Sequence, residues 1–186
     1  MPTQRTAACD VDDFKEALSR RLEPDAAHAL LARIGFAAIT YELLKGEIVE
    51  GLRSFFSWPD DTGELLPDEE YQTQVLSRDK NVYRASCLWL VEHMESFTLE
   101  DLDVLTRLHE QRGQAVHKGG YYFFNPEDDV DIELVRDAVD IVRRVGQFWG
   151  RINIEINSEF DDQEIADHEI RSGASMLCDM LLWVVK

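Results

Sequence analysis

Residues 24–56 decide the fold, and they read PDAAHALLARIGFAAITYELLKGEIVEGLRSFF. Apolar residues recur in this stretch every three or four positions, which is the repeat that gathers side chains on one face of an α-helix. Proline suits the first turn of a helix, because the N–H that it lacks would have no partner there. We therefore expect one long helix that begins at Pro24 and ends near Ser57.

The same periodicity appears on both sides of this stretch. It predicts further helices over residues 10–22, 68–94, 98–118, 131–152 and 165–184, with a break near 77–80. Thr98 followed by Asp101 is typical of a capping box at a helix start.

Two segments lack this repeat. Residues 58–67 combine two prolines, a glycine and several acids, which predicts a loop, and the aromatic run 121–124 predicts a short extended link whose rings pack on the bundle. The expected fold class is all-α: a single-domain bundle of five or six helices without strands, formed by residues 10–186 after a flexible tail, residues 1–9.

The composition narrows the setting of the protein. Its apolar runs are shorter than the roughly 20 residues that cross a bilayer, and the first ten residues do not resemble a secretory signal. Cys9, Cys87 and Cys178 are odd in number and lack metal or redox spacing, so we expect free thiols, two of them buried and one on the tail. These features favour a cytoplasmic protein without a membrane partner.

Charge is the strongest compositional signal. The chain has 37 acidic and 19 basic residues, a net charge of −18, which disfavours general adsorption to nucleic acid or to anionic membranes. A phosphate-binding site must therefore be a local exception. The sequence lacks the common nucleotide-binding, calcium and zinc-hydrolase motifs, so we expect no cofactor and no metal.

A candidate for such a local phosphate-binding site lies at the end of the predicted helix 98–118, where residues 112–119 read RGQAVHKG. This Arg-x4-His element, Arg112 to His117, resembles the motif of the HEPN superfamily. The resemblance implies a small helical bundle, often a dimer, of the kind that cleaves RNA without a metal in bacterial toxin and defence systems. A second match in spacing, Arg21-x6-His28, straddles Pro24 and lacks a glycine-containing turn after the histidine, so we treat it as unrelated.

The side chains of the motif suit this chemistry. An imidazole can move a proton near neutral pH, so His117 is the candidate general acid or base. Arg112 is the candidate catalytic cation, because a guanidinium presents a planar fork to phosphate oxygens. Arg107, His109 and Lys118 are the candidate substrate-binding residues around the pair.

The spacing also raises a geometric question. Five residues along a straight helix leave Arg112 and His117 about 140° apart. Convergence is therefore expected to need either local unwinding at Gly113 or a second copy of the motif, with Arg112 and His117 of two subunits sharing one cleft. Arg112 also lies on the apolar stripe that includes Leu105 and Leu108, where a cation needs a partner, a cleft or an interface.

Other interpretations stay open at this point. The pair could simply close the C-terminal end of its helix, where cations complement the helix dipole, and His109 could be a packing residue. The chain could then be a noncatalytic, acidic HEPN-like module that binds a basic protein partner, such as an antitoxin, and Gly113 suits this reading. A third hypothesis is that acidic helices imitate a nucleic-acid backbone.

Overall fold

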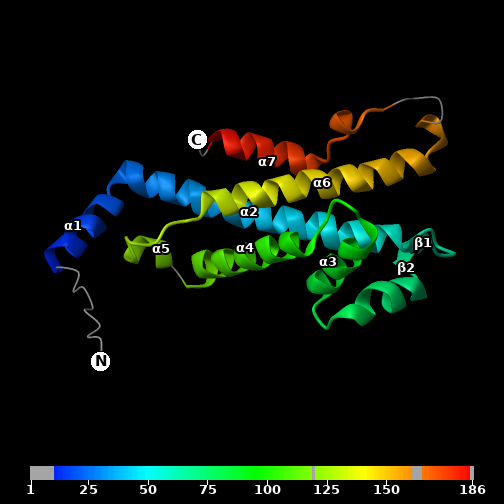
Figure 1. Cartoon of the computed structure of the whole chain (residues 1–186), viewed down its shortest axis with the longest axis horizontal. Coiled ribbons are helices and arrows are strands. Elements are labelled where there is room, and N and C mark those ends of the chain that lie inside the picture. Colours follow the sequence, from blue (N-terminus) through cyan, green and yellow to red (C-terminus); the bar gives the residue numbers. More distant parts are fainter. Residues whose placement is uncertain (1–10, 119, 161–164, 185–186) are drawn as a thin grey trace.

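A 32-residue helix, α2 (Pro24–Phe55), runs the length of the molecule, and the other long helices pack against it (Figure 1). The computed structural model describes residues 11–118, 120–160 and 165–184. The remaining helices are α1 (Val11–Arg21), α3 (Val82–His93), α4 (Leu99–His117), α5 (Tyr121–Phe124), α6 (Ile132–Ile156) and α7 (Gly173–Val184). The prediction of an all-helical, single-domain bundle is confirmed.

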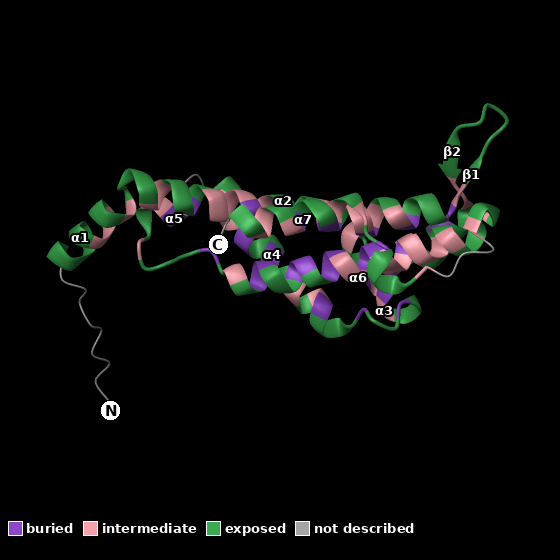
Figure 2. Cartoon of the chain, turned by 90° about the horizontal axis from the view of Figure 1, so that it is seen from above, coloured by how far each residue is buried: buried purple, intermediate pink, exposed green. Residues whose placement is uncertain are grey.

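The core lies where α2, α4 and α6 meet. In Figure 1, α4 runs opposite to α2 and α6 runs parallel to it, while α3 and α7 cover the sides. Figure 2 shows the buried residues on the facing sides of these helices, with α1 and the hairpin exposed at opposite ends. Fully buried side chains from all three helices form this core: Phe36, Leu44, Ile48 and Leu52 of α2, Leu105 and Leu108 of α4, and Val135 and Ile141 of α6.

Helix α2 is long and apolar enough, judged by length and composition, to cross a membrane. A core helix has the same character, and eight side chains of α2 are buried in the bundle. Its contact with α6 is close at one point. A Cβ atom at Gly51 would lie 2.3 Å from Nε1 of Trp149, so only glycine admits the indole, which donates to the Glu47 carbonyl over 2.9 Å.

The capping box at the start of α4 is confirmed and is tied to α6. The Thr98 hydroxyl accepts from the Asp101 N–H, and the Asp101 carboxylate accepts from the Thr98 N–H over 2.7 Å. Arg144 of α6 donates to the same carboxylate over 2.6 Å. Burial alone would raise the pKa of Asp101, but the hydrogen bonds from Arg144 and Thr98 together bring it below its usual range.

The break predicted near residues 77–80 is also present. The chain forms a π-helical turn, η1 (Tyr71–Val75), and a 3-10 turn, η2 (Leu76–Arg78), before α3 begins at Val82. Two further 3-10 turns, η3 (Ser158–Phe160) and η4 (Asp167–Glu169), lie between α6 and α7.

Three local predictions are wrong. The helix predicted over residues 165–184 begins only at Gly173, after the 3-10 turn η4. Residues 57–67 form a hairpin of two short antiparallel strands, β1 (Ser57–Pro59) and β2 (Leu65–Pro67), because the Asp60 carboxylate accepts bonds from Thr62 and Glu64 and closes the turn. The aromatic run 121–124 forms the single helical turn α5 instead of an extended link. Gly120 precedes it with a φ of 81°, a left-handed conformation that favours glycine and lets the chain reverse after α4.

Cys87 and Cys178 are free and buried, as predicted. Burial raises the pKa of the Cys87 thiol to about 12 and that of Cys178 to about 11, so both stay protonated near neutral pH. Cys9 and the expected tail, residues 1–9, lie outside the described residues.

Candidate functional site

The candidate site lies where α4 runs beside the middle of α2. Two consecutive residues of α2, Tyr41 and Glu42, contact His109 and Arg112 of α4, and Arg112 in turn contacts His117 at the end of the same helix. We refer to these five residues as the Arg112 cluster. It combines two imidazoles, a guanidinium, a phenol and a carboxylate on one side of the bundle.

Arg112 and His117 are in direct contact. The Nη1 atom of Arg112 lies 2.8 Å from Nε2 of His117. A guanidinium can only donate, so Nε2 of His117 is the acceptor in this contact. Helix α4 continues to His117, and the long arginine side chain closes the gap between the two faces. The expectation that unwinding or a second copy is needed for this contact is therefore wrong.

Two groups of α2 hold the guanidinium in place. Nη2 of Arg112 donates to the Glu42 carboxylate over 2.7 Å, and its guanidinium carbon lies 5.7 Å from the centre of the Tyr41 ring. The Arg112 side chain is only 23% exposed, and its Nε is buried without a hydrogen-bond partner among the described residues. The prediction that a cation on this stripe needs a partner is confirmed.

His109 joins Tyr41 instead of the Arg112–His117 pair. Its Nδ1 lies 2.8 Å from the Tyr41 hydroxyl, and the two ring centres are 5.2 Å apart. Burial, and then the charge of Glu42, raise the pKa of Tyr41, although Arg112 opposes them. The phenol therefore stays protonated, and its hydroxyl can exchange a hydrogen bond with the imidazole.

A hollow of about 500 Å³ opens beside Tyr41 and His109. Its wall includes two cationic side chains, Lys45 from α2 and Arg84 from α3. Arg84 pairs with Asp79 over 3.2 Å and is more than half exposed, so screening by water keeps this pair weak. The hollow thus places cations next to the Arg112 cluster in an otherwise acidic chain.

The structure does not bring the other two predicted residues to the pair. Arg107 pairs with Asp103, one turn earlier on α4, over 3.2 Å. Lys118 lies 5.5 Å from the centre of the Tyr121 ring. Neither side chain makes a hydrogen bond or ion pair with Arg112 or His117 in the described part of the chain. The positive charge near the motif is also reduced, because Glu42 pairs with Arg112 and Asp103 pairs with Arg107.

Four residues beside the pair were not predicted from the sequence. In the sequence, Tyr41 follows the apolar repeat and resembles an ordinary core residue. Glu42 and Lys45 fall on the polar face and resemble ordinary solvent-exposed residues. Arg84 lies on a different helix. These residues reach the site only because α4 and α3 both pack against α2, and the contacts of Tyr41 and Glu42 span 68 to 70 residues of the sequence.

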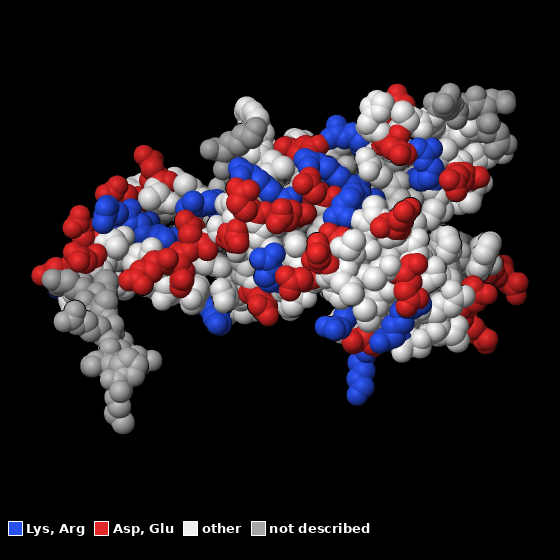
Figure 3. Space-filling view, viewed as in Figure 1, with Lys and Arg blue, Asp and Glu red and all other residues white. Residues whose placement is uncertain are grey.

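Charged groups of both signs surround the bundle. On the face shown in Figure 3, Lys and Arg side chains alternate with Asp and Glu, and many of the arginines are paired with carboxylates. The carboxylates do not form regular rows on this face. The hypothesis of a nucleic-acid mimic therefore gains no support from this view.

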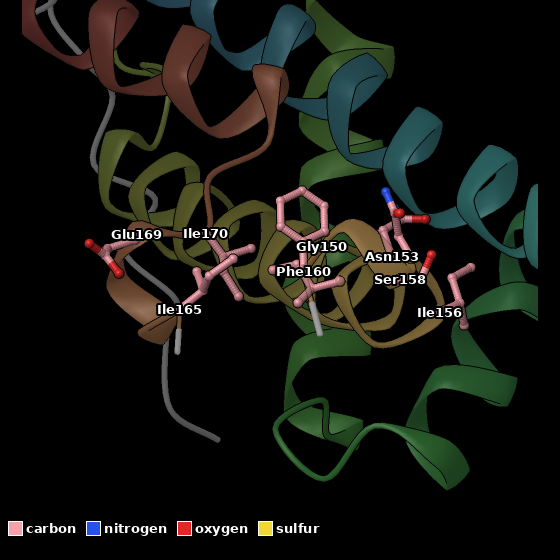
Figure 4. A pocket seen from close by; sticks show the side chains of 10 residues that line it. Gly150, Asn153, Ile156, Ser158, Phe160, Ile165, Glu169 and Ile170 are labelled. Atoms are coloured by element: carbon pink, nitrogen blue, oxygen red, sulfur yellow. The ribbon is translucent and has the colours of Figure 1, made fainter. Parts of the chain in front are cut away.

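A separate hollow of about 820 Å³ lies at the C-terminal end of α6. Figure 4 shows Phe160, Ile165 and Ile170 gathered over α6, with the Glu169 carboxylate pointing away from them. This carboxylate accepts a bond from the Ala166 N–H over 3.0 Å. The hollow is mainly apolar and offers no pair of acid–base groups among its lining residues.

Within residues 11–118, 120–160 and 165–184, no three His, Cys, Asp or Glu side chains lie close enough to hold a metal ion. Comparison with models of known protein families, with curated proteins and with solved structures gave no match.

Proposed function

We propose that this chain is a HEPN-like, metal-independent endoribonuclease of a toxin or defence system that acts as a dimer. The observation that carries the proposal is the 2.8 Å contact between Nη1 of Arg112 and Nε2 of His117. In this contact a guanidinium, which can bind phosphate, lies next to an imidazole whose Nε2 can accept a proton once the guanidinium has turned to another acceptor. RNA cleavage by internal transfer needs this combination, because it removes a proton from a 2′-hydroxyl while charge builds on the phosphorus.

The proposed reaction begins with an exchange of partners. A phosphate of the RNA replaces His117 as the acceptor for Nη1 of Arg112, and this frees Nε2 of the imidazole. The 2′-hydroxyl then gives its proton to Nε2 as its oxygen bonds to phosphorus. The bond from phosphorus to the 5′-oxygen breaks, and that oxygen takes a proton from His117 of the second subunit, which enters the reaction as a protonated imidazolium. The products are a 2′,3′-cyclic phosphate and a 5′-hydroxyl.

The surroundings of the pair support this use. The cationic hollow that contains Lys45 and Arg84 lies next to Tyr41 and His109, so it offers a place for a neighbouring phosphate. Electrostatic screening over about 8 Å lets such a local group act despite the net charge of the chain. Arg107 and Lys118 are exposed and are left as contacts for more distant parts of the RNA.

Access to the pair is compatible with a shared cleft. His117 is exposed, and its neighbour Val116 is a large apolar residue that is 48% exposed at the end of α4. An exposed apolar side chain beside a catalytic histidine is suited to contact with a second copy of the same surface. The dimer in this proposal places two such ends of α4 together.

The test uses the purified full chain in EDTA with a mixed-sequence RNA and with the same RNA carrying 2′-O-methyl groups. The proposal predicts cleavage of the unmodified RNA, products that end in 2′,3′-cyclic phosphates, and no cleavage of the methylated RNA. Cleavage of both RNAs, or of neither across a broad set of sequences, contradicts it. Light scattering at the assay concentration must also show a dimer, because a monomer cannot form the shared cleft.

A second candidate function is a noncatalytic protein-interaction module. A specific observation favours it: helix α7 exposes a stripe of large apolar side chains at helical spacing, namely Met176, Met180, Trp183 and Val184. Monomeric proteins seldom leave such a stripe open to water. This candidate predicts that the chain cleaves no RNA and that Trp183→Asp changes its assembly, which light scattering measures.

A further inference from the structure

A groove of about 900 Å³ runs between the C-terminal halves of α2 and α6, next to strand β1. Figure 1 shows these helix ends side by side at the end of the molecule that carries the hairpin. We call it the α2–α6 groove. Its size is within the range of small-molecule sites, and the proposed ribonuclease chemistry makes no use of it.

One side of the groove is aromatic. Phe55 and Trp149 lie with their ring centres 6.0 Å apart and their planes tilted by 42°. Phe55 is 44% exposed, so its ring is available to a ligand, and the exposed Trp58 of β1 stands at the rim. Gly51 fixes this wall, because only glycine lets the Trp149 indole lie against α2. Aromatic faces attract cations through their ring quadrupoles.

The other part of the lining is acidic. Five carboxylates line the groove, and the lining includes no Lys or Arg. Three of the five have partners nearby: Glu42 pairs with Arg112, Asp68 accepts from Trp58 and the Tyr71 N–H, and Glu70 accepts from Gln74.

The remaining two carboxylates belong to Glu47 and Glu50. Glu47 has no hydrogen bond or ion pair through its carboxylate among the described residues, and Glu50 has only a 3.9 Å pair with the exposed Arg53. They are therefore available to a ligand. At about 1.5 Å per residue, Glu42, Glu47 and Glu50 are spread over about 12 Å of α2, so negative charge extends along the groove.

We propose that the α2–α6 groove binds a linear polyamine, a diffusible chain of methylene groups that carries two or more ammonium groups. The ammonium groups would pair with Glu47 and Glu50 and lie over the face of Phe55, and the methylene groups would cover Trp149 and Ile152. A bare divalent cation fits less well, because no three acidic side chains of the described residues lie close enough together to hold a metal ion.

The experiment measures spermidine binding to the full chain by titration calorimetry and tryptophan fluorescence. n-Butylamine and Mg²⁺, at the same ionic strength, are the control ligands. The variant Glu47→Gln/Glu50→Gln is compared with Glu95→Gln/Glu110→Gln, which makes the same change in net charge at exposed positions outside the groove lining. Thermal unfolding of each variant shows that the fold is kept.

The proposal predicts that spermidine binds more tightly than either control ligand. It predicts that the groove variant loses about tenfold or more in affinity and that the control variant stays within about twofold. Phe55→Leu keeps an apolar side chain but removes the ring face, and it lowers the affinity about threefold. An equal loss in both double variants, or equal binding of Mg²⁺, means general attraction to an acidic surface and overturns the proposal. Tighter binding of a lysine-rich peptide than of spermidine overturns it in favour of a protein partner.

Discussion

The Nη1 atom of Arg112 lies 2.8 Å from Nε2 of His117, although the two residues stand five positions apart on one uninterrupted helix. Nη1 of Arg112 thus has His117 as its hydrogen-bond acceptor, and Nη2 donates to the carboxylate of Glu42. A phosphate must therefore compete with an imidazole and a carboxylate for Arg112. This competition makes the role of the cluster measurable.

Removing the charge of Glu42 is expected to raise RNA affinity. In Glu42→Gln the guanidinium keeps its contact with His117 but loses its carboxylate partner, so its positive charge is no longer neutralised. The Glu42 side chain is 50% exposed, so losing its ion pair with Arg112 should change the free energy of unfolding by less than about 1 kcal/mol. RNA binding and cleavage at low RNA concentration measure the effect. Glu110→Gln, with the same charge change on α4, is the control and should leave affinity unchanged within error.

Arg112→Lys tests the fork geometry separately from the charge. Lysine keeps the positive charge but cannot donate two parallel bonds to a phosphate. We expect the cleavage rate to fall by about 10² or more with little change in the melting temperature. A lysine variant that cleaves RNA like wild type would show that Arg112 supplies only charge.

Asp101→Asn tests the capping box and its dependence on pH. The pKa of Asp101 is below its usual range in the folded state, so its stabilising effect is complete above the pKa of the unfolded chain and is lost as the pH falls through the folded pKa. We expect Asp101→Asn to lower the free energy of unfolding by about 2–4 kcal/mol at pH 7. The loss should be much smaller in acid, because the wild-type carboxyl is then protonated and also carries no charge.

Urea unfolding at several pH values, from neutral to below the pKa of a free carboxyl, measures this difference. Asp103→Asn is the matched control on the same helix, because its pair with Arg107 is exposed and weak. A cost at Asp101 that does not change with pH would contradict the role of its charge.

Two alanine substitutions on α2 should have opposite effects. Gly51→Ala forces the Trp149 indole away from the helix, because the new Cβ would lie 2.3 Å from Nε1, and it should destabilise the fold by about 1–3 kcal/mol. Gly35→Ala meets no atom within 4 Å in the same helix and should stabilise it by about 0.5–1 kcal/mol. Urea unfolding at neutral pH measures both. Equal effects at the two positions would mean that the close approach of Trp149 is unimportant.

Much of the fold could be predicted from the sequence because local rules dominate it. The start of α2 at Pro24, the capping box of α4 and the apolar stripe of α6 each depend on residues a few positions apart. The hairpin and α5 were missed for a related reason. Turn residues reveal a reversal of the chain, but whether two three-residue strands pair, or one aromatic turn closes, depends on a few hydrogen bonds.

The site was predictable only in part. The helix repeat correctly placed Arg112 on a half-buried stripe that requires a partner. It could not identify Glu42 or Tyr41 as its neighbours, because those contacts arise from the packing of two helices. Helical angles gave the wrong prediction for the contact of His117 with Arg112, because they describe where a side chain starts and not how far an arginine reaches.

The most direct measurement compares RNA cleavage in EDTA by wild type and by His117→Ala. His28→Ala is the matched control, because His28 is also exposed and follows an arginine at a similar spacing, but in the structure that arginine, Arg21, donates to backbone carbonyls at Pro126 and Asp128. The account predicts that His117→Ala lowers the rate by about 10²–10⁴ at unchanged melting temperature, while His28→Ala cleaves like wild type. Equal cleavage by wild type and His117→Ala would contradict the account.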